Sequence, residues 1–428
     1  MKKQKKHFLR KRENEQRQIK RIVAQVKNEL TADITVEEET GPKEPAPHGE
    51  TEQLIDFLEQ HYAFRFNIVM GYAEYKEKGT GGSSWQPIDK RTINSLTLQA
   101  RLNGINIWNN DTWRYVESYK VDDYDPVKGY LDSVRGTWDG EDHIARLANC
   151  VKTTCKQWEP WFRRWLLAMV AQWTGQDNHY GNAVAPLLIS GQGYHKSTFC
   201  RQLLPPELSW GYMDSLILSE KKQVMQAMSQ MLLINLDEFN QISPTLQAGF
   251  LKNVIQLATV KMRRPYAKHV EEFPRMASFI ATTNMSDVLN DPTGCRRFIC
   301  IELTEPIDVD TPPCHRQLYA QILHLLDQGE HYWFDMQETQ AVMEHNCQYQ
   351  MKKPEESFFE DCFDITDNEA EGCYMSTTSI YEYIRQRMGS HLSEKSVINF
   401  GRSLASIEGI VRRRSKRGSE YLVIPKRR

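Results

Sequence analysis

The sequence predicts an α/β protein built around a P-loop nucleotide-binding core, and three segments in fixed order carry that prediction. They are GQGYHKST at 191–198, LLINLDEF at 232–239 and FIATTN at 279–284. Each marks the point where an apolar run ends abruptly in small or charged residues, as a buried parallel strand does at its carboxyl edge. We therefore expect a Walker A loop, a Walker B strand and a sensor strand, which together indicate nucleotide hydrolysis.

The composition is ordinary for a folded protein with two or three domains. The chain has 428 residues, of which 40% are apolar and 26% charged. Its net charge of -2 conceals basic segments at 2–27 and 412–428 and an acidic segment at 37–52. Basic ends on a near-neutral chain favour contact with a polyanion, and the alternative is that they are solvated tails.

The cysteines and apolar runs indicate neither zinc binding nor export. None of the nine cysteines forms a CxxC pair, and the close pairs Cys150/Cys155 and Cys295/Cys300 have the wrong spacing for zinc. No apolar run approaches the roughly 20 residues that a membrane span needs, and the N-terminus lacks a signal peptide's apolar stretch. We expect a cytoplasmic protein with reduced thiols and no membrane segment.

The order of patterns divides the chain into six expected parts. Apolar residues at helical spacing, followed by a Pro- and Glu-rich stretch, predict a terminal helix and a linker. Further along, Trp161, Trp165 and Trp173 recur at helical spacing, which indicates helix packing rather than a base-stacking platform. The parts are a basic helix and acidic linker at 1–52, an N-terminal α+β region at 53–150, a helical collar at 151–181, the P-loop core at 182–306, a helical connection at 307–354 and a winged-helix-like domain at 355–428.

The last part has the layout expected of a winged helix. Ser379 and Glu382 form a capping-box pair at the start of one helix, and a second helix begins near Ser393. The segment IVRRRSKRGSEYLVIP then predicts two strands around a basic turn. The residues expected to contact DNA here are Arg402, Arg413, Arg414, Lys416 and Arg417.

The first motif supplies groups that hold the phosphates of a nucleotide. Backbone N–H groups at a helix N-terminus face the anion, a lysine neutralises the β- and γ-phosphates, and a hydroxyl holds Mg²⁺. Lys196 is the expected phosphate lysine and Ser197 the magnesium ligand. The fit to GxxxxGK[ST] is imperfect, because Ser190 and His195 stand where that motif has glycine and His adopts positive φ only at a cost. The expected nucleotide-binding residues are Gly191, Gly193, His195, Lys196, Ser197, Thr198 and Asp237.

The second and third motifs supply two acids and an amide. A buried strand tolerates adjacent acids only at its end, so we expect Asp237 to hold Mg²⁺ and Glu238 to activate water. Asn284 ends the third strand and can orient that water between the acids and the γ-phosphate. ATP and Mg²⁺ are therefore the expected cofactors.

Two arginines extend the predicted catalytic site. The segment DPTGCRRF at 291–298 presents Arg296 and Arg297, and a guanidinium suits the spread charge of the phosphoryl transition state. The sequence does not distinguish which arginine is the finger. The alternative is a surface pair at a strand edge.

A basic segment lies between the second and third motifs. In ATVKMRRPYAKHVEEFPR, cations interleave with aromatic rings, a composition that suits gripping a nucleic-acid backbone. The alternative is a solvated basic loop. The residues expected to contact DNA are Lys261, Arg263, Arg264, Tyr266 and Lys268, and Arg275 and Phe273 belong to the same pattern.

With these motifs, the chain resembles the virulence-associated E family of P-loop proteins from phages and mobile elements. That family is similar to superfamily 3 helicases and to phage and poxvirus primase-helicases. The resemblance covers roughly 124–302, and the C-terminal part is similar to a domain appended in Bacteroides-type members. It rests on GxGxxKST from Gly191, LDE from Leu236, RRPY from Arg263, TTN from Thr282 and DPTGCRRF from Asp291.

The resemblance implies an ATPase of the AAA+ type. Such a protein would assemble into a homo-hexameric ring, take an arginine from the next subunit and pull on single-stranded or forked DNA. Primase activity is not expected, because the N-terminal part shows no acidic cluster suited to nucleotidyl transfer.

Three functions are compatible with these residues. The leading hypothesis is an ATP-dependent DNA helicase or translocase acting in replication of a mobile element or prophage. The first alternative is a DNA-binding regulator whose nucleotide site is a switch with little hydrolysis, which the departure at His195 supports. The second is an ATPase that remodels a protein partner in virulence or defence.

Overall fold

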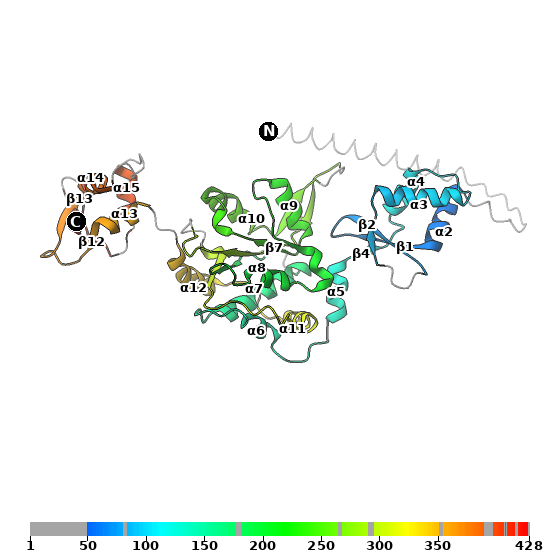
Figure 1. Cartoon of the computed structure of the whole chain (residues 1–428), viewed down its shortest axis with the longest axis horizontal. Coiled ribbons are helices and arrows are strands. Elements are labelled where there is room, and N and C mark those ends of the chain that lie inside the picture. The colour runs from blue at the N-terminus through cyan, green and yellow to red at the C-terminus, as the bar shows by residue number, and fades with distance from the viewer. Residues whose placement is uncertain are drawn as a thin grey trace, which may run out of the picture. The chain divides into compact units, whose positions relative to one another are not determined.

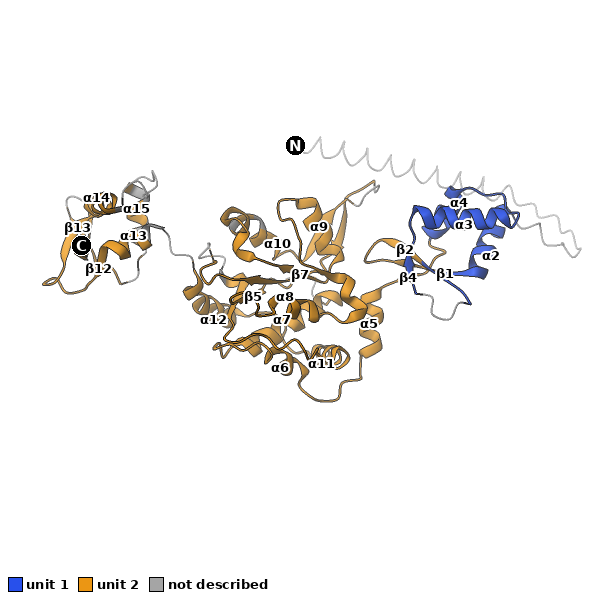
Figure 2. Ribbon diagram, viewed as in Figure 1, with its two compact units in different colours: residues 1–63, 75–118 blue, residues 64–74, 119–428 orange. Residues whose placement is uncertain are grey.

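The computed structural model describes residues 49–79, 84–176, 181–263, 268–289, 295–350, 354–388, 397–405, 407, 409–415 and 418–426. These residues belong to two compact units, one within 1–63 and 75–118 and the other within 64–74 and 119–428 (Figures 1 and 2). The basic helix and linker predicted for 1–52 lie outside the described residues, except for 49–52.

The first unit contains helices and part of a four-stranded sheet with the order β3-β2-β1-β4. The carboxylate of Asp89 accepts the backbone N–H of Thr92 at 2.8 Å and so caps the start of a helix. Leu54, Leu58 and Ile93 are fully buried. The elements are α2 (Glu50–His61), β3 (Gln86–Pro87), α3 (Lys90–Leu102) and α4 (Asn109–Val116).

The second unit contains a five-stranded parallel sheet with the order β11-β5-β10-β7-β6. Ala281 of β10 is level with Leu187 of β5 on one side and with Leu236 of β7 on the other. The carboxyl ends of these three strands therefore open at one edge, where the three predicted motifs follow them. The strands are β5 (Ala185–Ile189), β6 (Tyr212–Met213), β7 (Leu233–Leu236), β10 (Ser278–Thr283) and β11 (Phe298–Glu302).

Helices cover both faces of this sheet, because its strands present apolar side chains alternately to each face. In β5, Leu188 belongs to one apolar cluster, and Leu187 and Ile189 belong to the other. The cluster with Leu188 includes residues of α5 (Pro126–Val134), α6 (His143–Ala148), α7 (Trp158–Trp173), α8 (Lys196–Gln202) and α11 (His315–Asp327). The cluster with Leu187 includes residues of α9 (Lys221–Gln230), the short helix η2 (Phe239–Gln241), η3 (Leu246–Leu251) and α10 (Lys252–Val254).

The tryptophans of α7 lie in the core, which confirms that their spacing reflects helix packing. Trp161, Trp165 and Trp173 are 3%, 0% and 6% exposed. They share an apolar cluster with Leu188 of β5. The segment expected to form a helical collar is therefore a layer of the sheet's own core.

The second unit also contains elements outside this sheet. Among the helices that the structure describes, none combines the length and apolar character needed to cross a bilayer. The elements are β4 (Asp123–Tyr124), η1 (Pro206–Gly211), β8 (Thr259–Met262), β9 (Glu271–Pro274), η4 (Cys295–Arg297), α12 (Met336–Asn346) and η5 (Cys347–Tyr349). The strands β1 (Tyr62–Asn67) and β2 (Tyr72–Glu77) each have residues in both units.

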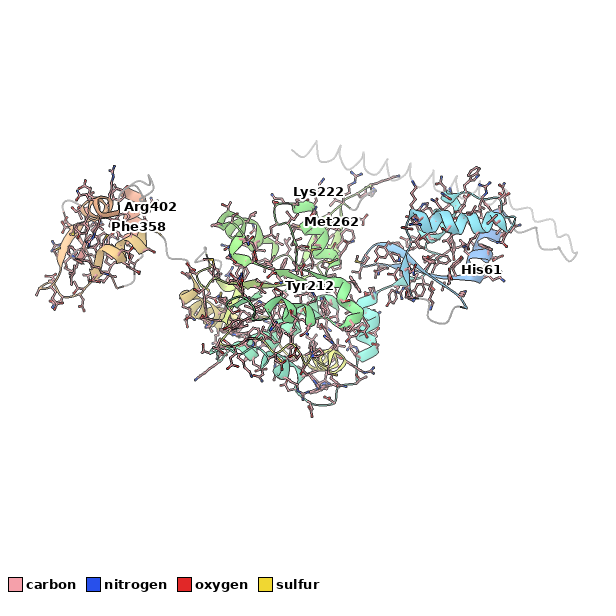
Figure 3. All side chains as sticks on the ribbon, in the orientation of Figure 1. His61, Tyr212, Lys222, Met262, Phe358 and Arg402 are labelled. Atoms are coloured by element: carbon pink, nitrogen blue, oxygen red, sulfur yellow. The ribbon has the colours of Figure 1, made fainter. Side chains whose placement is uncertain are left out.

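The last part of the chain has a core of its own. Its side chains Phe359, Ile380, Phe400 and Leu404 are at most 1% exposed, and β15 pairs antiparallel with β12, β13 and β14. The two helices and the hairpin expected from the sequence are present as α14, α15 and β14–β15 (Figure 3, where Arg402 marks α15). The elements are α13 (Pro354–Cys362), β12 (Phe363–Ile365), β13 (Cys373–Ser376), α14 (Thr377–Met388), α15 (Val397–Leu404), β14 (Arg412–Ser415) and β15 (Gly418–Pro425).

Arg275 is 1% exposed, whereas the described cations Lys261, Arg263 and Lys268 of the same basic segment are exposed. Its guanidinium donates to four backbone carbonyl oxygens at 2.6–3.0 Å. Buried carbonyls need such partners, so Arg275 is a structural residue rather than a DNA contact. The carbonyls belong to Asn182, Ile255, Leu257 and Ala277.

Replacing Arg275 by Met tests this structural role. The variant keeps most of the side-chain volume but leaves the carbonyls without their donor, so we expect the free energy of unfolding to fall by about 3 kcal/mol or more. Urea denaturation followed by circular dichroism measures it. Arg263→Met is the control, since this exposed arginine lies in the same basic segment. Equal stability of the two variants would contradict the assignment.

Candidate nucleotide-binding site

The loop after β5 reverses the chain so that Lys196 begins helix α8. Gly193 has φ of 81° and His195 has φ of 59°, both in the left-handed region that residues with a Cβ adopt only with strain. His195 stands where the motif has glycine, and it keeps the left-handed backbone conformation that glycine favours. The side chain of His195 is exposed at the mouth of the cleft.

Lys196 is 8% exposed and is surrounded by oxygen atoms. Its Nζ donates to the backbone O and the Oγ of Ser190 and to the O of Gly191, each at 2.9 Å, and to Oδ1 of Asn284 at 3.1 Å. Burial lowers the pKa of Lys196, and the nearby charge of Asp237 opposes that shift. The ammonium group is thus held in place by oxygens that a phosphate group could replace.

Three elements meet at Asp237. Ser197 of α8 donates from its Oγ to the two carboxylate oxygens of Asp237 at 3.2 and 3.3 Å. Thr282 of β10 donates to the same carboxylate. A hydroxyl and a carboxylate in contact provide the hard oxygen ligands that Mg²⁺ prefers.

Thr282 is a site residue that was not among those predicted. It lies within the TTN motif, but nothing in the sequence shows that its hydroxyl points to Asp237. The register of β10 beside β7 brings the two residues together.

Glu238 follows directly and adopts a strained backbone. Its φ is 49°, its side chain is exposed, and its carboxylate accepts a hydrogen bond from Gln241. Within the described part of the chain, His195 and Glu238 are the two non-glycine residues with positive φ, and both line the same cleft. Strain of this kind persists where the surrounding structure enforces it, often at functional sites.

These side chains line one cleft of about 380 Å³ at the carboxyl edge of the sheet. It brings together most of the residues predicted from the three motifs, while Gly191 contributes its carbonyl oxygen to Lys196. In the described ranges, no group of three or more His, Cys, Asp or Glu side chains is arranged to hold a metal ion. The lining residues are Gln192, Gly193, Tyr194, His195, Lys196, Ser197, Thr198, Asp237, Glu238, Thr282, Thr283 and Asn284.

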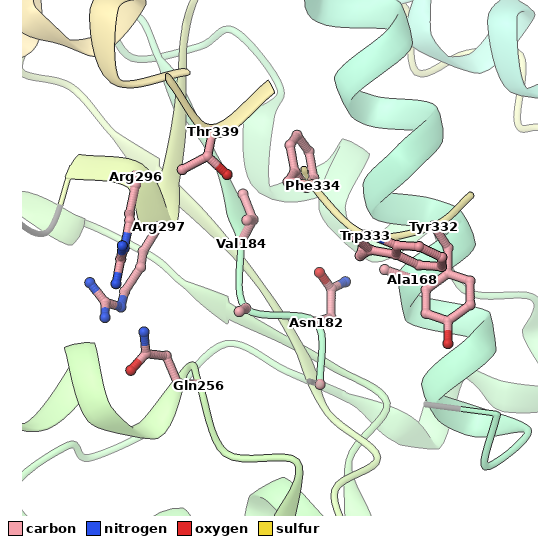
Figure 4. Close-up of a pocket in the computed structure, with 12 residues that line it drawn as sticks. Ala168, Asn182, Val184, Gln256, Arg296, Arg297, Tyr332, Trp333, Phe334 and Thr339 are labelled. Atoms are coloured by element: carbon pink, nitrogen blue, oxygen red, sulfur yellow. The ribbon is translucent and has the colours of Figure 1, made fainter. Parts of the chain in front are cut away.

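The two predicted arginines lie away from this cleft. They precede β11, which pairs with β5 from Phe298 beside Ala185 onward, so they stand at the amino edge of the sheet. Arg296 is exposed, whereas Arg297 is 4% exposed. Both line a second pocket, shown in Figure 4.

The cations of the β8–β9 hairpin are exposed where the structure describes them. Lys261, Arg263 and Lys268 face solvent, and Nζ of Lys261 lies 3.5 Å from a carboxylate oxygen of Glu272. The predicted contacts Arg264 and Tyr266 lie outside the described residues.

The predicted cations of β14 divide between its two faces. Arg413 lies 2.8 Å from the carboxylate of Glu420, and its guanidinium stands 3.5 Å from the ring centroid of Tyr374. Strand alternation sends Arg412 and Arg414 to the opposite side. Lys416 and Arg417 lie outside the described residues.

Arg412 was also not among the residues expected to contact DNA. It donates to Oγ of Ser419 at 2.7 Å. With Arg402 it lines a pocket of about 370 Å³ that also includes Thr377 and Tyr421. Arg402 of α15 and Arg412 of β14 thus share one surface.

Among solved structures, "The apo structure of NrS-1 C terminal region (305-718)" is 14% identical, with a TM-score of 0.45, over 89% of this chain and 100% of that chain. The A form apo structure of that region gives the same identity and TM-score over 88% of this chain and 100% of that chain. Scores at this level do not establish a common fold. No curated protein matches the sequence.

Two families match consecutive parts of the chain. A domain of unknown function described from a B. Theta gene matches residues 352–423, which make up the C-terminal part. The virulence-associated protein E-like domain matches residues 131–352, a span of more than half of the chain that includes the cleft and both arginines. The chain belongs to the virulence-associated protein E-like family.

Proposed function

We propose that this protein is a Mg²⁺-dependent ATPase that moves along or unwinds DNA during replication of a mobile genetic element or prophage. One observation carries the proposal: Lys196 and Ser197, which begin helix α8, meet Asp237, which follows strand β7, in a single cleft. Membership of the virulence-associated protein E-like family agrees with the proposal.

Three residues of the cleft would bind the phosphates and Mg²⁺. Lys196 would exchange its contacts with Ser190, Gly191 and Asn284 for the β- and γ-phosphate oxygens. Ser197 and Asp237 would hold Mg²⁺, whose bound charge neutralises the phosphates.

The remaining polar groups would act on the attacking water. Glu238 is exposed at the cleft and would accept the proton of that water. Asn284 would orient the water once Lys196 has turned to the phosphates. Thr282 would hold the Asp237 carboxylate in position.

Exposure distinguishes the two arginines. Arg297 is buried and lines the pocket at the amino edge of the sheet, whereas Arg296 is exposed and could reach a ligand outside the chain. Arg296 stands at the sheet edge opposite its own cleft, so it would act as the finger for the nucleotide of a neighbouring copy. This supports assembly into a homo-oligomeric ring of the AAA+ type, with six subunits as the resemblance implies.

Two basic surfaces would bind DNA. The exposed cations of the β8–β9 hairpin suit a single strand. The two helices α14 and α15 followed by the β14–β15 hairpin support a winged helix, in which Arg402, Arg412 and Arg414 would contact duplex phosphates.

A nucleotide-controlled DNA-binding regulator is the second candidate, and the exposed, left-handed His195 favours it. A side chain at this position restricts how closely the loop can approach a phosphate. This candidate predicts tight nucleotide binding with negligible turnover, so a hydrolysis assay separates the two functions.

Replacing Lys196 by Ala tests the proposed activity. The wild-type protein should hydrolyse ATP with stimulation by single-stranded DNA, and the variant should lose about 100-fold or more of that rate because the phosphate charge is no longer neutralised. Phosphate release measures both rates. Lys222→Ala, which removes an exposed lysine of α9, is the matched control and should retain the wild-type rate. Equal rates for wild type and Lys196→Ala would reject the ATPase.

A charge-matched set of variants tests the DNA surface. Arg402→Ala combined with Arg412→Ala should weaken duplex DNA binding at least tenfold. The slope of log affinity against log salt concentration should become shallower by about two, because two phosphate contacts are lost. Fluorescence anisotropy at several salt concentrations measures both. Arg413→Ala combined with Arg385→Ala removes the same charge elsewhere in this part and should have a smaller effect. Equal losses would show that net charge, rather than this surface, binds DNA.

A further inference from the structure

A pocket of about 510 Å³ opens at the amino edge of the sheet, away from the nucleotide cleft. Figure 4 shows its two ends: Arg296, Arg297 and Gln256 gather at one, and three consecutive aromatic residues lie at the other. The aromatic residues are Tyr332, Trp333 and Phe334. None of the three motifs contains them.

Trp333 is 49% exposed, yet its ring is held by neighbours. The rings of His331 and Tyr332 meet it in edge-on geometry, with centroids 3.8 and 5.2 Å away. Arg164 of α7 ties down the same segment, because it donates to the backbone O of His331 and lies 2.9 Å from the carboxylate of Glu338. The exposed indole is therefore already ordered before any partner binds.

Ordered, exposed tryptophan and arginine side chains are typical of the centre of a protein interface. Covering the indole would remove apolar area from water, and its rotamer entropy is already restricted, so binding it costs less. The same pocket contains Arg296, which is exposed at the end opposite the aromatic residues.

We propose that this pocket binds a second copy of the chain and that Trp333 is the apolar centre of this interface. The argument rests on the proposed function, because Arg296 can complete a nucleotide site only in another copy. The charges are complementary: the pocket presents a guanidinium, and the rim of the nucleotide cleft presents the exposed carboxylates of Asp237 and Glu238. Arg296 would reach the neighbour's nucleotide while Trp333 fixes the two copies against each other.

The test replaces Trp333 by Ala in the full chain and measures particle mass by sedimentation, with and without Mg·ATP. Assembly should weaken at least tenfold, and ATP hydrolysis should fall at protein concentrations where the wild type is assembled. Nucleotide binding by each separate chain should be retained. Trp108→Ala is the matched control, since this indole is 67% exposed in the other unit and does not line the pocket; it should assemble like the wild type.

Wild-type assembly by Trp333→Ala would overturn the proposal, as would a wild-type protein that stays monomeric under all conditions. A loss of single-stranded DNA affinity without a change in assembly would also overturn it and assign the pocket to nucleic acid. If the wild type binds no nucleotide but Trp333→Ala still loses assembly, the proposed ATPase function is wrong. The assignment of the pocket as the contact between two copies is then still supported.

Discussion

The constraint on which the site depends is the parallel sheet, which gathers the ends of non-adjacent segments at one edge. Asp237 lies 41 residues after Lys196 and 47 residues before Asn284, yet each of the three follows a strand whose carboxyl end opens at that edge. The strands are buried on both faces because their apolar side chains alternate between two clusters. Charged groups can therefore lie only at the strand ends. Packing and chemistry therefore have the same origin.

The same sheet also separates the two halves of the proposed catalytic apparatus. The lysine, the acids and the amide lie at the carboxyl edge, and the exposed Arg296 lies at the amino edge. One copy of the chain cannot bring them together without dismantling the sheet. In our account, hydrolysis is thus a property of neighbouring copies, and the aromatic pocket beside Arg296 gives those copies a place to meet.

The mixed α/β fold and most of the cleft could be predicted from the sequence, because strand ends and motif residues are local patterns. What could not be predicted depends on long-range packing. In the sequence, Arg275 is one cation of a basic segment whose neighbouring cations are exposed. In the fold it is buried and surrounded by backbone carbonyl groups. Adjacent letters cannot show that Arg296 is exposed and Arg297 buried, and the partner of Thr282 depends on the register of two strands far apart in the chain.

The central claim is that the cleft binds a nucleotide through Mg²⁺ held by Ser197 and Asp237. The most direct measurement is calorimetric titration of the wild-type protein with a non-hydrolysable ATP analogue, with Mg²⁺ present and with the metal removed by a chelator. The account predicts saturable binding that weakens at least tenfold without the metal. Absence of binding in Mg²⁺, or binding of equal strength without it, would contradict the account.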